Sequence, residues 1–115
     1  MAKRTFSVTG KSERAMLLEV QARNFTLLVD EPKNLGGEDA GPTPVEYLLS
    51  ALSGCINVVS HVVAKEMGLE LKRLEIAVEG DLDPARFMGI SMENRAGFQE
   101  IRVRQIGRAS CRERV

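Results

Sequence analysis

The sequence has no net charge that would attract a charged partner. Its 115 residues include 16 basic and 16 acidic side chains, and aromatic residues make up only 4% of the chain. A nucleic-acid binder needs a basic surface, usually with aromatic side chains interleaved. No such stripe is present, so nucleic acid is not expected as a partner.

Long apolar runs and export signals are also missing. Nowhere do eighteen uninterrupted apolar residues occur, and no apolar segment follows the charges at the N-terminus. These absences argue against a membrane span and a secretory signal. The two cysteines, Cys55 and Cys111, are then expected to be reduced thiols. We expect one soluble, cytoplasmic domain, the usual count for a chain of this length.

Metal ligands and phosphate-binding motifs are scarce. His61 is the only histidine, and together with Cys55 it does not reach the ligand count of a zinc site. It follows Cys55 by six residues, which places it on another helix face and argues against a Cys-His catalytic pair. Residues 35–42 lack the lysine and the spacing of a phosphate loop. Neither a metal nor a cofactor is expected.

Alternating and branched apolar residues predict an α+β fold. The sequence predicts five strands, at residues 4–9, 15–21, 24–30, 71–80 and from 98 to 105. Residues 10–13 have turn chemistry, and the first three strands are short and adjacent, which favours an antiparallel meander. Residues 31–43 are rich in proline and glycine and predict a loop.

Residues 44–67 predict one long helix. Thr43 can cap it, with Pro44 at the first helical position and Glu46 at the third, which is a capping box. Apolar residues then recur at helical spacing with almost no charge between them, so most of the circumference should be buried. At about 36 Å the helix is too long and too apolar for one small domain to cover. A partner subunit is therefore expected.

Cys55 lies in the middle of this helix among apolar neighbours. At three and four residues on either side stand Ala51, Leu52, Val58 and Val59. Apolar neighbours do not stabilise a thiolate, and the helix dipole has little effect so far from the helix start. Plain packing and cysteine chemistry both stay open. Glu46 is about 13 Å away along the axis, so its ordinary role is capping.

Two arginines could supply a positive charge near Cys55. Arg14 and Arg23 flank the second predicted strand, and the meander could bring either one over the helix. A fixed positive charge would favour a thiolate there. The alternative is that each is a solvated surface arginine. Activation of Cys55 would otherwise have to come from a second subunit.

The last ten residues, 106–115, differ from what precedes them. They read Ile-Gly-Arg-Ala-Ser-Cys-Arg-Glu-Arg-Val and break the strand alternation. Back-translated as ATC GGA AGA GCG TCG TGT AGG GAA AGA GTG, they look like read-through into a common sequencing adapter. We therefore expect a domain at residues 1–105 and a non-native tail at 106–115, and Cys111 is not counted as a resolving thiol. The alternative is a basic natural tail.

Residues 41–55 resemble the signature of the OsmC/Ohr family of osmotically induced and organic-hydroperoxide-resistance proteins. They read Gly-Pro-Thr-Pro-Val-Glu-Tyr-Leu-Leu-Ser-Ala-Leu-Ser-Gly-Cys. The resemblance covers nearly all of residues 1–105. It implies an α+β subunit with an N-terminal antiparallel meander, a long central helix and further strands, assembled as an intertwined homodimer.

The resemblance also implies a chemistry. In the family's peroxidases the cysteine that matches Cys55 attacks a peroxide as a thiolate and becomes a sulfenic acid, which a second cysteine near the C-terminus resolves. This implies a cytoplasmic peroxidase for organic hydroperoxides that a dithiol reduces, with Cys55, Glu46 and Arg14 as its catalytic residues. The classical peroxidases place the acid one residue earlier, where this chain has Val45.

One feature of the family is missing. No second cysteine follows Cys55 within residues 1–105, and neither does the final helix that carries it. The domain is therefore expected to be incomplete at its C-terminus and not competent for turnover as written. Two alternatives stay open: a non-catalytic dimeric module that binds an apolar small molecule, and a truncated fragment that aggregates or forms a molten dimer.

Overall fold

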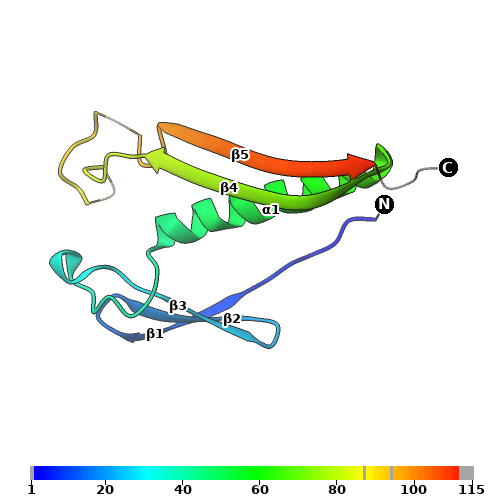
Figure 1. The fold of residues 1–115 in the computed structure, drawn as a ribbon. Helices are drawn as coiled ribbons and strands as arrows, with labels where there is room; N and C mark the ends of the chain where they lie inside the picture. The colour runs from blue at the N-terminus through cyan, green and yellow to red at the C-terminus, as the bar shows by residue number, and fades with distance from the viewer. Residues whose placement is uncertain (1, 87, 94, 112–115) are drawn as a thin grey trace. The chain divides into compact units, whose positions relative to one another are not determined.

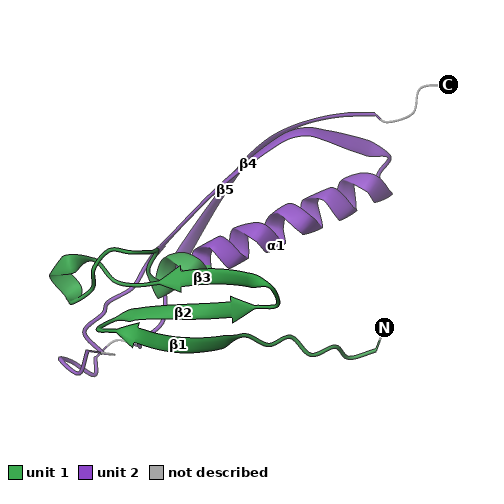
Figure 2. Ribbon diagram, turned by 90° about the horizontal axis from the view of Figure 1, so that it is seen from below, with its two compact units in different colours: residues 1–48 green, residues 49–115 purple. Residues whose placement is uncertain are grey.

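The protein is described by a computed structural model that covers residues 2–86, 88–93 and 95–111 (Figure 1). The elements are β1 (Thr9–Arg14), β2 (Leu17–Ala22), β3 (Phe25–Val29), the short 3-10 helix η1 (Lys33–Leu35), α1 (Pro44–Glu66), β4 (Leu69–Asp81) and β5 (Glu100–Cys111). They form two compact units, Met1–Leu48 and Leu49–Val115 (Figure 2). The α+β class is confirmed.

The first unit contains a three-stranded antiparallel sheet in the order β1-β2-β3. This confirms the predicted meander, and β2 and β3 lie within two residues of their predicted bounds. The prediction for the first strand was wrong: β1 occupies the segment expected to turn, and the turn falls at Ala15, whose φ is 49°. All six β1 residues are exposed, and an exposed edge strand accepts polar residues once it has a partner to pair with.

Helix α1 begins and ends as the sequence predicts. The Thr43 N–H donates to Glu46 Oε1 over 2.9 Å, and the Glu46 N–H donates to Thr43 Oγ1 over 3.2 Å. This reciprocal pair is the capping box. At the other end Gly68 has a φ of 72°, and its N–H donates to the Lys65 carbonyl over 3.1 Å. Local chemistry therefore sets both ends of the helix.

The second unit pairs β4 with β5 as a long antiparallel ribbon (Figure 1). Gln105 Nε2 donates to Ser60 Oγ over 3.3 Å and ties this ribbon to α1. The strand predicted to stop at Gln105 continues to Cys111, which pairs with Leu69. That prediction was wrong because β4 offers backbone partners along its whole length, which outweighs a weak side-chain pattern. The origin of residues 106–115 stays a prediction, and resequencing through the junction tests it.

Most of the α1 surface is not covered by the residues that the structure describes. Among the described residues the buried hydrophobic side chains are Leu17 and Ala64, and only the second belongs to α1. The prediction that most of the helix circumference is buried is therefore wrong for the described residues of a single chain. By length and composition alone α1 could also cross a membrane. The core helix of a soluble protein and a signal sequence meet the same criteria.

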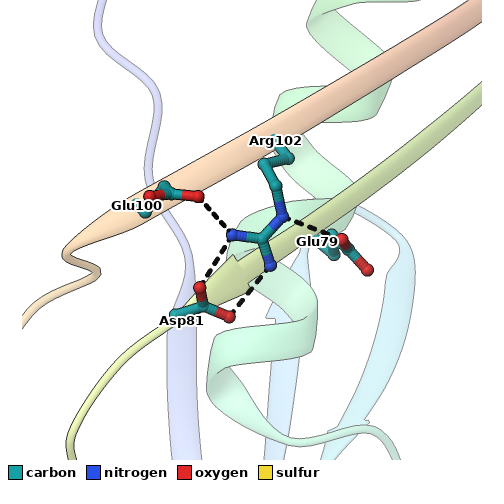
Figure 3. A network of polar contacts seen from close by, with 4 residues as sticks. All are labelled: Glu79, Asp81, Glu100 and Arg102. Atoms are coloured by element: carbon teal, nitrogen blue, oxygen red, sulfur yellow. Dashed lines mark hydrogen bonds and ion pairs between the residues drawn. The ribbon is translucent and has the colours of Figure 1, made fainter.

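Arg102 joins three carboxylates at one end of the ribbon (Figure 3). Its guanidinium forms two parallel bonds with Asp81, of 2.7 and 2.9 Å, and further bonds with Glu79 over 2.8 Å and Glu100 over 2.6 Å. The bond from Arg102 lowers the pKa of Asp81 even though desolvation opposes the shift. One cation thus holds together three carboxylates that would otherwise repel one another.

Replacing Arg102 with glutamine should loosen this end of the ribbon. The three carboxylates then repel one another without a cation between them, so the amides near Asp81 and Glu100 should exchange their hydrogens several-fold faster. Salt above about 0.5 M should reduce the difference, because it screens exposed charges. The matched control is Arg104→Gln, on the same strand and facing Ala77. Equal exchange in the two variants would contradict the prediction.

Candidate functional site

Cys55 is a free, exposed thiol at the centre of an apolar stripe on α1. At 100° per residue, one face of the helix carries this stripe. The Cys55 stripe consists of Leu48, Ala51, Cys55, Val58, Val59 and Val62. Its larger side chains are between 53% and 60% exposed. The thiol therefore stands on an apolar surface that the described part of this chain leaves uncovered.

Another face of α1 is directed toward the ribbon of the second unit. Ser60 accepts the bond from Gln105, and Ala64, one turn further, is 7% exposed. Both lie well away from Cys55 around the helix, by more than 100°. The helix therefore has one face covered by its own chain and a separate apolar face that carries the thiol.

Glu46 acts as a helix cap in this chain. Its carboxylate accepts the Thr43 N–H, as described above. Nine residues separate it from Cys55, which amounts to half a turn around the helix and about 13 Å along it. Glu46 and Cys55 of one helix therefore point in opposite directions.

Arg14 is held by a carboxylate that the sequence did not single out. At the end of β1, its Nε donates to Glu38 Oε2 over 2.7 Å and its Nη2 donates to Glu38 Oε1 over 3.0 Å. The hydrogen bond with Glu38, followed by the charge of Glu38, raises the pKa of Arg14. The other candidate, Arg23, lies in the turn between β2 and β3, with its guanidinium 5.0 Å from the centroid of the Phe25 ring.

Asp30 is a buried carboxylate that sequence reasoning missed. It is 1% exposed. Its Oδ1 accepts the N–H of Glu31 over 2.8 Å, and its Oδ2 accepts the N–H groups of Glu38 and Ala40 over 3.1 Å each. Burial tends to raise the pKa of Asp30, but the three N–H bonds and the charge of Arg14 outweigh it and lower the pKa. The sequence signal that could have singled out Asp30 is its position between a predicted strand and a loop rich in glycine and proline.

The segment that follows is wound tightly around this carboxylate. We call residues 30–41 the Asp30 loop. Gly37 has no room for a side chain, because a Cβ there would lie 1.9 Å from the Glu31 carbonyl oxygen. The Asp39 N–H donates to that same oxygen over 3.0 Å, and the Asp30 N–H donates to the Pro42 carbonyl over 3.1 Å. The loop is therefore an ordered structure with its own hydrogen bonds.

The remaining candidates do not add a metal or thiol site. Within residues 2–86, 88–93 and 95–111, no group of three or more His, Cys, Asp or Glu side chains is arranged to hold a metal ion. His61 is exposed on α1. Cys111 is a free, exposed thiol at the end of β5.

Comparisons with known proteins agree with this architecture. The sequence model of the family described as OsmC-like protein matches residues 36–111, which is more than half of the chain. The crystal structure of an OsmC-like protein from Mycoplasma pneumoniae is similar, with a TM-score of 0.78 and 17% sequence identity, over 94% of this chain and 72% of that one. At this identity the likeness shows the fold alone. No curated protein matches the chain.

Proposed function

Because this chain belongs to the OsmC-like protein family, we propose that it is a cytoplasmic thiol-dependent peroxidase that reduces organic hydroperoxides. The family is associated with hydroperoxide resistance and includes peroxidases. The observation that carries the proposal is the Cys55 stripe, which combines a free, exposed thiol with apolar side chains on both sides. An organic hydroperoxide has a polar peroxide group and an apolar tail. The Cys55 thiol can react with the peroxide group, and the apolar side chains of the stripe can contact the tail.

The reaction follows ordinary thiol chemistry. The Cys55 thiolate attacks one peroxide oxygen, the O–O bond breaks, and the leaving alkoxide takes a proton to become an alcohol. Cys55 is then a sulfenic acid. One thiol of an external dithiol condenses with it to a mixed disulfide and releases water, and the second thiol displaces Cys55 and restores it. The cycle reduces one peroxide and oxidises one dithiol.

The proposed assembly is a homodimer in which a second copy packs against the Cys55 stripe and leaves an opening through which a hydroperoxide reaches the thiol. Side chains such as Val58 and Val59 are too exposed for a stable monomer surface of this apolar character. In addition, Glu46 faces away from Cys55 on its own helix, so an acid next to the thiol would have to come from elsewhere. A second copy can supply both the cover and the missing polar groups.

The test is direct trapping of the oxidised thiol. Treated with an organic hydroperoxide and a sulfenic-acid trap, the protein should gain one label on Cys55, whereas a Cys55→Ala variant should gain none there. A Cys111→Ala variant should still be labelled at Cys55, because the proposal gives Cys111 no role. Labelling of the protein no greater than in the Cys55→Ala variant would reject the peroxidase. It would favour the non-catalytic module that binds an apolar small molecule.

A further inference from the structure

The contact between Arg14 and Glu38 leaves part of the guanidinium available. Arginine carries five N–H donors in a fixed plane. Glu38 takes the Nε donor and one donor of Nη2, so the two donors of Nη1 and one donor of Nη2 are left. The carboxylate thereby fixes the plane of the guanidinium and directs its other edge away from Glu38. A bidentate contact sets orientation in a way that a single charge cannot.

The position of Glu38 depends in turn on Asp30. The Glu38 N–H is one of the two that donate to Asp30 Oδ2, so the backbone that carries the Glu38 side chain is fixed at a buried atom. Gly37, directly before it, is packed against the Glu31 carbonyl and Asp30 Oδ1. The side chain of Glu38 therefore leaves a backbone held by hydrogen bonding and close packing, while Arg14 approaches from β1.

We infer that Asp30 and Glu38 are positioning residues for Arg14: Asp30 fixes the loop, the loop presents Glu38, and Glu38 holds the guanidinium in one orientation. The inference rests on the proposed function and on the catalytic role that the family resemblance implies for Arg14, as the cation that favours the Cys55 thiolate and its peroxide substrate. Its new content is that two acids outside the motif at residues 41–55 set how Arg14 acts. Neither acid touches the substrate.

A double-mutant cycle tests whether Glu38 acts through Arg14. Glu38→Gln keeps the shape of the side chain and removes its charge, and we expect it to slow hydroperoxide oxidation of Cys55 about threefold, the scale of one exposed ion pair. In an Arg14→Ala background the same substitution should have no further effect. The matched control is Asp39→Asn, which removes one charge at the next position and should leave the rate unchanged. Equal slowing by Glu38→Gln in both backgrounds would overturn the inference.

A second readout does not depend on activity. In a nitrogen-15 NMR spectrum the Nε–H of Arg14 should exchange slowly with water in the unmodified protein, because Glu38 holds it. Glu38→Gln and Asp30→Asn should each speed that exchange at least several-fold, and Asp39→Asn should not. If Asp30→Asn fails to fold, Glu38→Gln still carries the test. Equally fast exchange in the unmodified protein and in Glu38→Gln would overturn the inference.

The two readouts separate the inference from the proposed function. If Cys55 proves unreactive but the Arg14 Nε–H depends on Glu38 and Asp30, the positioning stands and the peroxidase is rejected. If Cys55 reacts but the exchange of the Arg14 Nε–H does not depend on Glu38 or Asp30, the peroxidase stands and the positioning is rejected.

Discussion

Replacing Val59 with aspartate is expected to convert the protein from dimers into monomers. Val59 is one turn from Cys55 and is 59% exposed in the single chain, so the proposed dimer would bury it. An unpaired carboxylate in an apolar interface costs several kcal/mol, and a two-fold interface carries the substitution twice. Each 1.4 kcal/mol weakens association about tenfold, so the dissociation constant should rise by at least about a thousandfold.

Sedimentation equilibrium measures this effect. The unmodified chain should have a mass near twice 12.7 kDa, and the Val59→Asp chain should have a mass near 12.7 kDa at the same concentration. The matched control is Asn57→Asp, which adds the same charge to an exposed, polar position of the same helix and should leave the dimer intact. A monomeric unmodified chain, or a dimer that tolerates Val59→Asp, would contradict the proposed assembly.

The same substitution reports on the site. Cys55 lies within the Cys55 stripe, so loss of the dimer should also remove whatever the second copy contributes to the thiol. Under the proposed function, Val59→Asp should lower the rate of sulfenic acid formation together with the dimer fraction. Asn57→Asp should preserve both.

The elements that the sequence predicted well are those set by neighbouring residues. Thr43, Pro44 and Glu46 define the start of α1 through contacts within four residues, and the structure confirms that start. β1 was misplaced because its residues take their conformation from β2, across a turn whose position the side-chain pattern does not reveal. β5 was ended too early for the same reason. The limits of a strand depend on the neighbouring strand with which it pairs, whereas a helix cap depends on residues next to it in the sequence.

The candidate site shows the same division. Cys55 could be singled out from a motif of fifteen residues, and Arg14 could be named as one of two arginines. The contact that distinguishes Arg14 joins residues 24 positions apart, and it exists because a buried aspartate shapes the loop that carries Glu38. Sequence spacing carries no signal for such a contact. Asp30 and Glu38 therefore became visible only through hydrogen bonds that the fold creates.

Replacing Asp30 with asparagine is expected to destabilise the first unit strongly at neutral pH. Asp30 uses both oxygens to accept three backbone N–H groups, whereas asparagine has one oxygen and would turn its NH₂ group toward a donor. Each buried donor left without an acceptor costs stability. We expect the midpoint of thermal unfolding to fall by roughly 5 to 10 °C, and the Glu38 and Ala40 amides to lose protection from hydrogen exchange.

The pH dependence of this loss identifies its cause. The pKa of Asp30 is lowered from its ordinary value of 3.8, so the folded state favours the charged form. The stability that this carboxylate contributes is therefore complete above about pH 4 and is lost as the pH falls through the lower folded pKa. The difference between the unmodified protein and Asp30→Asn should thus be largest near pH 7 and should shrink below pH 3.8. The Asp39→Asn control should unfold like the unmodified protein throughout, and a difference that stays constant down to pH 2.5 would show that the charge of Asp30 is not what holds the loop.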